Sequence, residues 1–131
     1  MSKNVIVIGG VALGPKAASR LKRLDPSANV TMIDENTNIS FGGCGIPYYV
    51  SGEINSLAAL RSTTYGTVRT PDYFEHKGVH TLNRTRVTAI DRAAKTVTAK
   101  NLDSGEEATL PYDRLVIATG STPKVPPVEG R

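Results

Sequence analysis

The stretch NVIVIGGVALGPKAASRL, residues 4–21, decides the fold of this chain. Its first five residues form an almost continuous apolar run, which is typical of a strand buried on both faces. Glycines at positions 9, 10 and 14 follow, and residues 15–24 have the spacing of an amphipathic helix. A second apolar run, Asn29–Ile33, predicts another strand. Strand, helix and strand in this order build a parallel sheet, so we expect an α/β fold.

The helix predicted at residues 15–24 has two different faces. Its apolar residues share one face, namely Ala17, Ala18, Leu21 and Leu24. Its basic residues share the opposite face at spacings of four and three, namely Lys16, Arg20 and Arg23. Most charge stripes of this kind are simply solvated, and the alternative is a surface that binds anions.

Two further kinds of strand follow later in the chain. Val79–Leu82 predicts a third strand of the sheet. From residue 86 the apolar period changes to two, which predicts a small antiparallel β-meander over about residues 85–113. Arg114–Ala118 is apolar again and predicts a fourth core strand. We therefore expect a parallel sheet with a meander inserted before its last strand.

The segment between the second and third strands is less regular. Pro47–Val50 predicts a short helix, and residues 51–70 predict a loop with a helical turn within residues 54–60. Thr70 and Pro71 are typical of a helix start, with Thr70 as the cap. That helix should stop at the glycine of position 78.

Three glycines and one carboxylate indicate a nucleotide site. Gly9, Gly10 and Gly14 lie between a buried strand and a helix, where backbone N–H groups can approach a phosphate. Val11 takes the place of the usual middle glycine. Asp34 ends the second strand 20 residues after Gly14, where a carboxylate accepts from a ribose hydroxyl. The pattern predicts a dinucleotide site, and a tight turn without a ligand is the alternative.

Three stretches resemble a known family. They are VIVIGGVALG (5–14), IDENTNISFGGCGIPYY (33–49) and LVIATGSTPKVPPVEG (115–130). In this order they resemble the flavin-dependent pyridine nucleotide–disulfide oxidoreductases. Within that family they are similar to the single-cysteine branch of coenzyme A-disulfide reductases, persulfide reductases, NADH oxidases and peroxidases. The resemblance implies that residues 1–131 are the N-terminal part of a Rossmann-like FAD-binding domain.

The resemblance also implies the cofactors and their contacts. In the family this unit binds FAD, and NAD(P)H binds a separate domain. The implied FAD contacts are Gly9, Gly10, Val11, Ala12, Gly14, Asp34, Glu35, Val87, Ala118, Thr119 and Gly120. Asp34 replaces the usual glutamate, and because both are carboxylates we expect the ribose contact to remain. The stretch from residue 126 to 131 matches the hinge that leads into the NAD(P)H-binding and dimerisation domains, which we expect to be absent from this chain. We expect the chain alone to hold FAD weakly and to oxidise no NAD(P)H.

Cys44 is the only cysteine and the candidate catalytic residue. Pro47 predicts a helix that starts just after it, and a helix N-terminus favours the thiolate, which is the reactive form. The glycines at positions 42, 43 and 45 remove side chains that would block a ring or a substrate. The family's nucleophile lies in a motif S-F-x-x-C-G, which matches Ser40, Phe41, Cys44 and Gly45. The alternative is a buried structural cysteine.

The chemistry of a lone cysteine leaves several functions open. Because position 49 is Tyr49, no second cysteine forms an internal disulfide with Cys44. Cys44 would form a mixed disulfide or persulfide with a substrate, or a sulfenic acid with oxygen or peroxide. The reduced flavin, FADH2, would then reduce the sulfur, and NAD(P)H would reduce the flavin. A nucleotide-binding module without catalysis is the alternative of another class.

We expect the substrate to be a small disulfide or persulfide, and the residues leave open whether it is attached to coenzyme A. The Pro-Tyr-Tyr after the cysteine is similar to the coenzyme A-disulfide and persulfide reductases. Those enzymes usually carry asparagine before the cysteine, in contact with the coenzyme A arm, where this chain has Gly43. The resemblance implies substrate contacts by Lys16, Arg20, Arg23, Ser40 and Lys77.

The composition excludes some partners and sets a default location. The chain has 131 residues, a formal net charge of +4 and no tryptophan, and aromatic residues make up 5%. A basic balance suits anionic partners, whereas so few aromatic residues do not suit a nucleic-acid platform. The N-terminus has neither a signal peptide nor a membrane span, so we expect a cytoplasmic protein, and in full length a homodimer. No pattern indicates a metal site.

Overall fold

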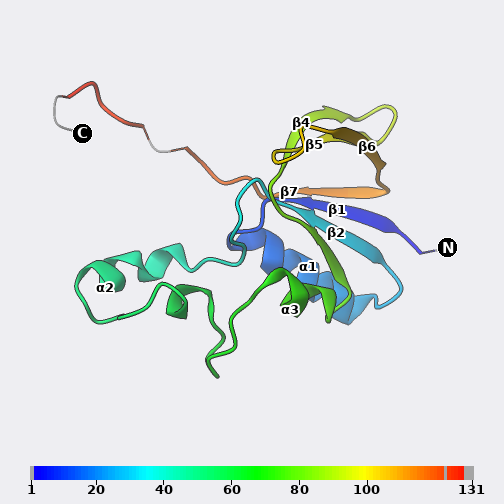
Figure 1. The fold of residues 1–131 in the computed structure, drawn as a ribbon. Coiled ribbons are helices and arrows are strands. Elements are labelled where there is room, and N and C mark those ends of the chain that lie inside the picture. The colour runs from blue at the N-terminus through cyan, green and yellow to red at the C-terminus, as the bar shows by residue number, and fades with distance from the viewer. Residues whose placement is uncertain (1, 123, 129–131) are drawn as a thin grey trace.

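A four-stranded parallel sheet lies at the centre of the molecule (Figure 1). The computed structural model describes residues 2–122 and 124–128. The strands have the order β3-β2-β1-β7, with bounds β1 Asn4–Ile8, β2 Asn29–Ile33, β3 Val79–Leu82 and β7 Arg114–Ile117. In the register of the sheet, Val7 of β1 lies opposite Met32 of β2 and Val116 of β7. Each strand lies where the sequence predicts it, except that β7 ends one residue earlier, and the α/β fold is confirmed.

Two helices cover one face of this sheet. They are α1, Leu13–Leu24, and α3, Pro71–Glu75. α1 begins two residues before the predicted start, because Pro15 fits in the first turn, where its missing N–H has no intrahelical partner to lose. Alternate residues of each strand point to this face. The core there contains the buried residues Val5, Val7, Ala18, Ala28, Val30, Met32, Ile39, Phe74 and Val79.

The predicted apolar face of α1 is buried only in part. Ala18 is fully buried and Leu21 packs against the core, but Leu24 is exposed. Leu24 is the last residue of α1, and no described residue covers that position. The chain turns at Asp25, whose pKa is lowered by hydrogen bonds from Ser27, the hydroxyl first and then the amide. The three basic residues of the opposite face are exposed, as predicted.

A three-stranded antiparallel meander covers the other face of the sheet (Figure 1). Its strands are β4 Thr85–Asp91, β5 Thr96–Asn101 and β6 Glu107–Pro111, which confirms the predicted insertion. The apolar contact between meander and sheet contains Ile6, Ile8, Ile33, Val97 and Ala99. Since Val5 and Val7 face the helices while Ile6 and Ile8 face the meander, β1 is buried on both sides, which is why its sequence is apolar throughout.

The segment between β2 and α3 extends away from the sheet (Figure 1). It contains a 3₁₀ turn η1, Gly43–Gly45, the short helix α2, Ile46–Val50, and a second 3₁₀ turn η2, Ala59–Arg61. The helix after Cys44 is therefore confirmed. The predicted helical turn is η2, which overlaps the last two residues of the predicted window 54–60 and extends one residue beyond it. Leu60 of η2 is buried, and its carbonyl accepts from the amide of Gly42 at 2.7 Å. This contact folds the segment back toward the cysteine.

The start and stop signals of α3 act as the sequence predicts. The hydroxyl of Thr70 accepts from the amide of Tyr73 at 3.4 Å, and Pro71 is the first helical residue. The helix itself ends at Glu75, and helical turns continue to Gly78, which has a φ of +75°. The end of the predicted hinge, residues 129–131, lies outside the described residues. Among residues 2–122 and 124–128, no helix has the length and apolar character needed to cross a bilayer.

Candidate functional site

A cleft of about 420 Å³ opens at the carboxyl ends of β1, β2 and β7. This is the edge of a parallel sheet at which open α/β folds bind their ligands. Of the predicted cofactor residues, the cleft is lined by Gly9, Val11, Asp34, Glu35, Val87, Ala118, Thr119 and Gly120. These residues come from four separate segments of the chain, so the fold brings the predicted site together. Gly10, Ala12 and Gly14 do not line this cleft, although they belong to the same turn.

Gly9 and Gly14 allow the turn to pack tightly. Gly9 has a φ of +106°, and a Cβ atom there would overlap the carbonyl oxygen of Ala118. A Cβ atom on Gly14 would overlap the carbonyl oxygen of Gly9. The first glycine therefore lets β1 approach β7, and the last lets α1 approach β1. Both glycines are required by the protein's own packing, whatever ligand occupies the cleft.

The carboxylate of Asp34 organises the same turn from within. Asp34 is buried, and its Oδ2 accepts from the amide of Gly10 at 2.6 Å. Its Oδ1 accepts from the backbone and side-chain amides of Asn36 at 2.8 and 2.9 Å. The amide of Gly10 is thus used inside the protein, which corrects the expectation that it faces a phosphate. Within the described residues no hydrogen bond occupies the amides of Val11 and Ala12, which remain available to an anion.

The rim of this cleft holds an ion pair that the sequence did not reveal. Nε of Arg86 lies 2.7 Å from Oε2 of Glu35, and both side chains are about half exposed. Arg86 belongs to β4, and its neighbour Val87 lies at a bulge where the register with β5 shifts. The alternating pattern of β4 predicts that Arg86 lies on a strand, but only the tertiary structure shows that its side chain reaches Glu35.

A second cleft of about 440 Å³ is lined by four cations and no acid. The cations are Lys16, Arg23, Arg69 and Lys77. Three of them are predicted substrate residues, and Ser40, also predicted, lines the same cleft. Arg20 is exposed but does not line it, and Arg69 is an addition that no sequence motif indicated. The ammonium group of Lys77 lies over the ring of Tyr73, 4.4 Å from its centroid.

Cys44 is exposed and its thiol is free. This excludes the alternative of a buried structural cysteine. It lies in η1, directly before α2, and lines neither of the two clefts. Gly42, two residues earlier, does line the basic cleft. The thiol is therefore accessible beside the basic cleft, and the expected approach to a flavin remains a prediction.

The glycines around Cys44 have different roles. A Cβ atom on Gly45 would lie 2.5 Å from a methyl carbon of Leu60, and one on Gly42 would lie 3.0 Å from the carbonyl oxygen of Leu60. A Cβ atom on Gly43 would have no atom within 4 Å. The interpretation of all three glycines as clearance for a ligand is thus corrected: two of them lie close against Leu60, and only Gly43 leaves open space.

Ser40 connects the two clefts. Its side chain is buried, and its backbone has a φ of +55°, which is uncommon for a residue other than glycine. Its amide donates to the carbonyl oxygen of Gly10 at 2.6 Å, and its hydroxyl accepts from Nη1 of Arg69 at 3.0 Å. The start of the cysteine loop is therefore bonded to the glycine turn on one side and to the basic cleft on the other.

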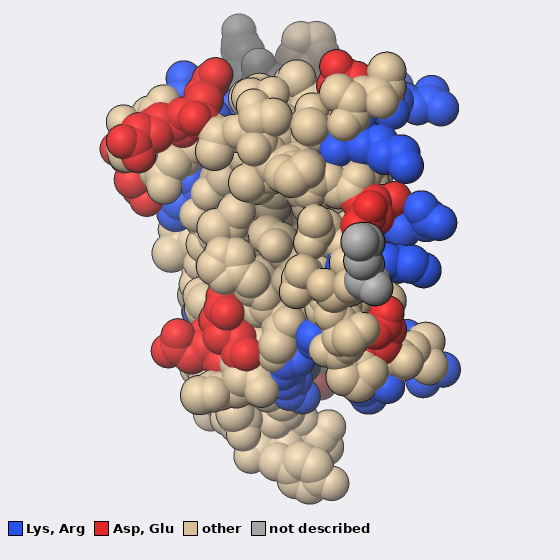
Figure 2. Space-filling view, turned by 90° about the vertical axis from the view of Figure 1, so that its right-hand side faces the viewer, with Lys and Arg blue, Asp and Glu red and all other residues tan. Residues whose placement is uncertain are grey.

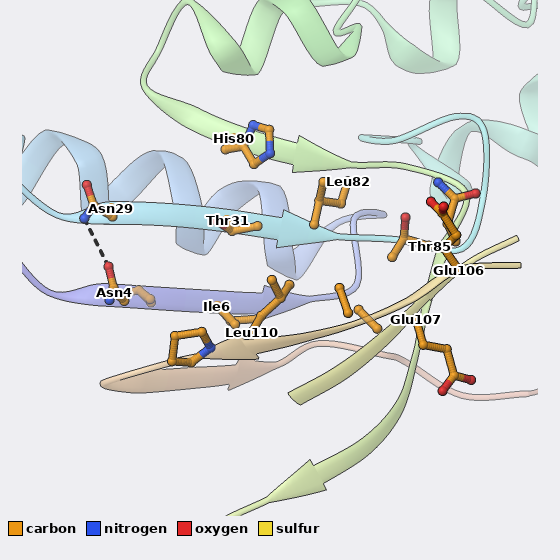
Figure 3. Close-up of a pocket in the computed structure, with 15 residues that line it drawn as sticks. Asn4, Ile6, Asn29, Thr31, His80, Leu82, Thr85, Glu106, Glu107 and Leu110 are labelled. Carbon is orange, nitrogen blue, oxygen red and sulfur yellow. Dashed lines mark hydrogen bonds between the residues drawn. The ribbon is translucent and has the colours of Figure 1, made fainter. Parts of the chain in front are cut away.

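A hollow of about 800 Å³, larger than either cleft, lies elsewhere (Figure 3). It separates the amino-terminal halves of β1 and β2 from the meander, and Ile6, Leu82 and Leu110 point into it. Figure 2 shows that face of the molecule, with charged side chains around an uncharged middle. The hollow contains none of the predicted cofactor or substrate residues. The cleft of about 420 Å³ is therefore the candidate nucleotide site, because the carboxyl ends of the parallel strands and the glycine turn meet there.

Known proteins share both the sequence and the fold. An NADH oxidase of Enterococcus faecalis is 37% identical over 126 residues, which are 96% of this chain and 27% of that protein. A coenzyme A disulfide reductase of Staphylococcus haemolyticus is 31% identical over 120 residues, 91% of this chain and 26% of its own. A solved NAD-dependent persulfide reductase from A. fulgidus is 48% identical with a TM-score of 0.91, and the match covers 97% of this chain and 23% of that one.

These relatives are much longer than the chain, which spans about a quarter of their length. The match is nevertheless continuous, since residues 3–131 fit the family described as "Pyridine nucleotide-disulphide oxidoreductase". The strand, the glycine turn and the carboxylate on which the resemblance rested, and the separately predicted meander, all occupy the expected places in the fold. The chain therefore belongs to the pyridine nucleotide-disulphide oxidoreductase family.

Proposed function

We propose that this chain is the N-terminal part of the FAD-binding domain of an enzyme that reduces a disulfide, persulfide or polysulfide with NAD(P)H. The observation that carries the proposal is the position of the cysteine loop. Ser40 bonds the loop to the glycine turn and lines a cleft of four cations, and a free, exposed thiol follows at Cys44. A redox cofactor site, a thiol and an anion-binding cleft are thus adjacent in one chain.

The nucleotide cleft has the groups that FAD requires. The free amides of Val11 and Ala12 would bind the pyrophosphate, and Asp34, which lines the cleft, would accept from a ribose hydroxyl. Ala118, Thr119 and the backbone near Val87 would enclose the rest of the cofactor. When bound, FAD supplies the transfer of two electrons between NAD(P)H and sulfur. A solved FAD-dependent relative from Desulfovibrio vulgaris, 43% identical with a TM-score of 0.60, supports this cofactor.

Cys44 would act as the nucleophile. Its thiolate attacks one sulfur of the substrate's S–S bond, a mixed disulfide or persulfide forms on Cys44, and the other sulfur leaves as a thiolate. Two electrons from NAD(P)H then release the sulfur bound to Cys44. The overall reaction converts a disulfide, NAD(P)H and one proton into two thiols and NAD(P)⁺. Exposure of the thiol is a requirement of this role, and Cys44 meets it.

The second cleft favours a substrate with several negative charges. Four cations without a lining acid repel one another, and a polyanion relieves that repulsion. A thiol carrier that ends in phosphates, such as coenzyme A, has this chemistry, and relatives that are named for coenzyme A disulfide support it. Gly43 leaves open the space beside Cys44 where such a carrier would bring its sulfur.

The experiment is the replacement of Cys44 by serine in the full-length protein. We expect the release of thiol from coenzyme A disulfide or persulfide at the expense of NAD(P)H to fall at least about 1,000-fold, because the hydroxyl is a far weaker nucleophile. Reduction of ferricyanide by NAD(P)H should persist, because that acceptor takes electrons from the flavin directly. Thiol release at the wild-type rate by Cys44→Ser would contradict the proposal, because it would show that Cys44 is not the nucleophile.

An NADH oxidase or peroxidase is the second candidate. Two observations favour it: the 37% identity with the E. faecalis NADH oxidase, and Gly43 in place of the asparagine that the resemblance associates with coenzyme A. In that reaction Cys44 would pass through a sulfenic acid. The products separate the two candidates, since the oxidase forms water from oxygen, whereas the reductase releases thiol or sulfide without consuming oxygen.

The complete protein would contain more than this chain. Because relatives are about four times as long, we propose that an NAD(P)H-binding domain and a dimerisation domain complete the enzyme, which then acts as a cytoplasmic homodimer. A free, exposed cysteine suits a reducing compartment. Sedimentation of the full-length protein at twice the monomer mass is the result expected, and a monomer that retains full activity would contradict the dimer.

A further inference from the structure

Arg69 occupies a position that none of the sequence motifs explains. It follows Val68, whose bridge with Ser62 closes a small loop, and its own amide donates to the carbonyl oxygen of Arg61 at 2.9 Å. Its side chain reaches across this loop to Ser40, 29 residues earlier in the chain. The guanidinium therefore joins the segment around η2 to the start of the cysteine loop.

The guanidinium of Arg69 makes two hydrogen bonds but has further N–H donors without an acceptor. Nη1 donates to the hydroxyl of Ser40 at 3.0 Å, and Nη2 donates to the carbonyl oxygen of Ser62 at 2.5 Å. Nε is buried and has no acceptor among the described residues. A guanidinium has five N–H groups, so one further N–H remains on each Nη atom. A buried donor without a partner is costly, which indicates that the side chain is placed for a reason other than its own hydrogen bonds.

The surroundings of Arg69 indicate what its remaining donors would bind. It lines the basic cleft together with Lys16, Arg23 and Lys77, and none of these four takes part in an ion pair among the described residues. Arginine binds phosphate and carboxylate groups in a bidentate manner, whereas lysine offers a single point charge. Arg69 is also the only one of the four with a hydrogen bond to the loop that leads to Cys44 in the described structure.

The hydroxyl of Ser40 completes the connection. The hydroxyl accepts from Arg69, but its own proton has no acceptor among the described residues. Ser40 is only 3% exposed. The positive φ of Ser40 must be held by its surroundings, and the bonds to Gly10 and Arg69 do so. A shift of the guanidinium would therefore change the position of Ser40, which lies four residues before Cys44 in the chain.

We propose that Arg69 is a positioning residue that binds an anionic group of the substrate and, through Ser40, orders the loop that carries Cys44 when that group is present. The proposal rests on the proposed function, because it assumes that a polyanionic carrier enters the basic cleft. It assigns to Arg69 a role that the other three cations do not share. They contribute charge to the cleft, whereas Arg69 contributes charge and the connection to the cysteine loop.

The experiment uses the full-length flavoprotein and inorganic pyrophosphate, a polyanion without sulfur. We expect wild-type protein to bind pyrophosphate by calorimetry and to show at least fivefold slower hydrogen exchange across residues 40–45 when it is bound. Arg69→Gln should weaken binding about tenfold, the loss of one charge-assisted contact, and should remove the slowing. Arg69→Lys should recover part of the affinity without the slowing, because lysine lacks the planar fork whose two terminal nitrogens contact Ser40 and Ser62 separately.

Two matched variants separate charge from position. Ser40→Ala keeps all four cations of the cleft but should lose the slowing at residues 40–45 when pyrophosphate is bound at saturation. Arg92→Gln removes the same charge from the exposed turn between β4 and β5 and should change neither measurement. Flavin content and thermal unfolding are measured for each variant, and if Arg69→Gln does not fold, Arg69→Lys and Ser40→Ala still test the connection.

Several results would overturn the inference. They are wild-type protein that does not bind pyrophosphate, Arg69→Gln with affinity within twofold of wild type, and slowing at residues 40–45 that persists in Arg69→Gln or Ser40→Ala. Failure of the proposed function is seen separately, as the absence of Cys44-dependent thiol release by wild-type protein. Binding and exchange are measured without turnover, so the inference and the proposed function can fail independently.

Discussion

Replacing Asp34 with alanine should loosen the glycine turn that forms the nucleotide cleft. The carboxylate of Asp34 accepts three hydrogen bonds: one from the amide of Gly10 at 2.6 Å and two from Asn36 at 2.8 and 2.9 Å. Asp34→Ala removes all three acceptors at once. The amide of Gly10 is buried and would be left without a partner, whereas Asn36 is exposed and would turn to water.

The magnitude follows from these two environments. A buried bond to a charged acceptor contributes about 1.5–3 kcal/mol, and the exposed pair at Asn36 adds about 1 kcal/mol in total, since water replaces most of it. We therefore expect the free energy required to open the glycine turn locally to fall by about 3 kcal/mol. At about 1.4 kcal/mol for each factor of ten, the protection of the Gly10 amide from hydrogen exchange should fall about 100-fold.

Hydrogen exchange of flavin-free, full-length protein measures this change locally, in peptides that cover residues 9–14 and 33–40. The matched control is Asp113→Ala, which removes a carboxylate that accepts from the backbone amide of Asn4 at 2.8 Å, at an exposed site. That variant should change exchange at Asn4 by less than about fivefold and leave Gly10 unchanged. Exchange at Gly10 within threefold of wild type in Asp34→Ala would refute the assignment of Asp34 as the organiser of the turn.

Three other outcomes are expected. Gly14→Ala should destabilise the domain by about 3 kcal/mol and lower the flavin content of purified protein, because its Cβ would overlap the carbonyl oxygen of Gly9; Gly43→Ala, which meets no atom, is the control. Gly43→Asn should leave Tm within about 2 °C and lower KM for coenzyme A disulfide, and an unchanged KM would speak against a carrier arm at that position. The 131-residue chain alone should retain little FAD on gel filtration, and stoichiometric FAD that NADH bleaches would contradict this.

Secondary structure could be predicted well because it depends on local patterns. The apolar run of β1 predicted a strand covered on both sides, and the helices and meander do cover it. The alternating period of β4, β5 and β6 predicted the meander, and Thr70 with Pro71 predicted the start of α3. The differences lie at element ends: β7 ends one residue before the predicted end, and α1 begins two residues before the predicted start.

The candidate site was predicted only where a motif names its residues. The glycine turn, Asp34 and the residues near Ala118 meet in one cleft as expected. The inward bond of the Gly10 amide was missed, because only the placement of β2 beside β1 brings the Asp34 carboxylate to it. The roles of the glycines at positions 42 and 45 were missed as well, because they depend on Leu60, which no local pattern connects to the cysteine loop.

The sequence by itself determined the order of the strands and helices, the glycine turn with its carboxylate, the single thiol and the family. Each of these is encoded in residues that are close together or in a fixed spacing. Only the tertiary structure decided that Arg69 joins Lys16, Arg23 and Lys77 in one cleft and that Ser40 connects this cleft to the nucleotide turn. The physical reason is that these contacts join segments up to 61 positions apart, from residue 16 to residue 77, and the register of the sheet and the packing of α1 and α3 against it determine which side chains meet.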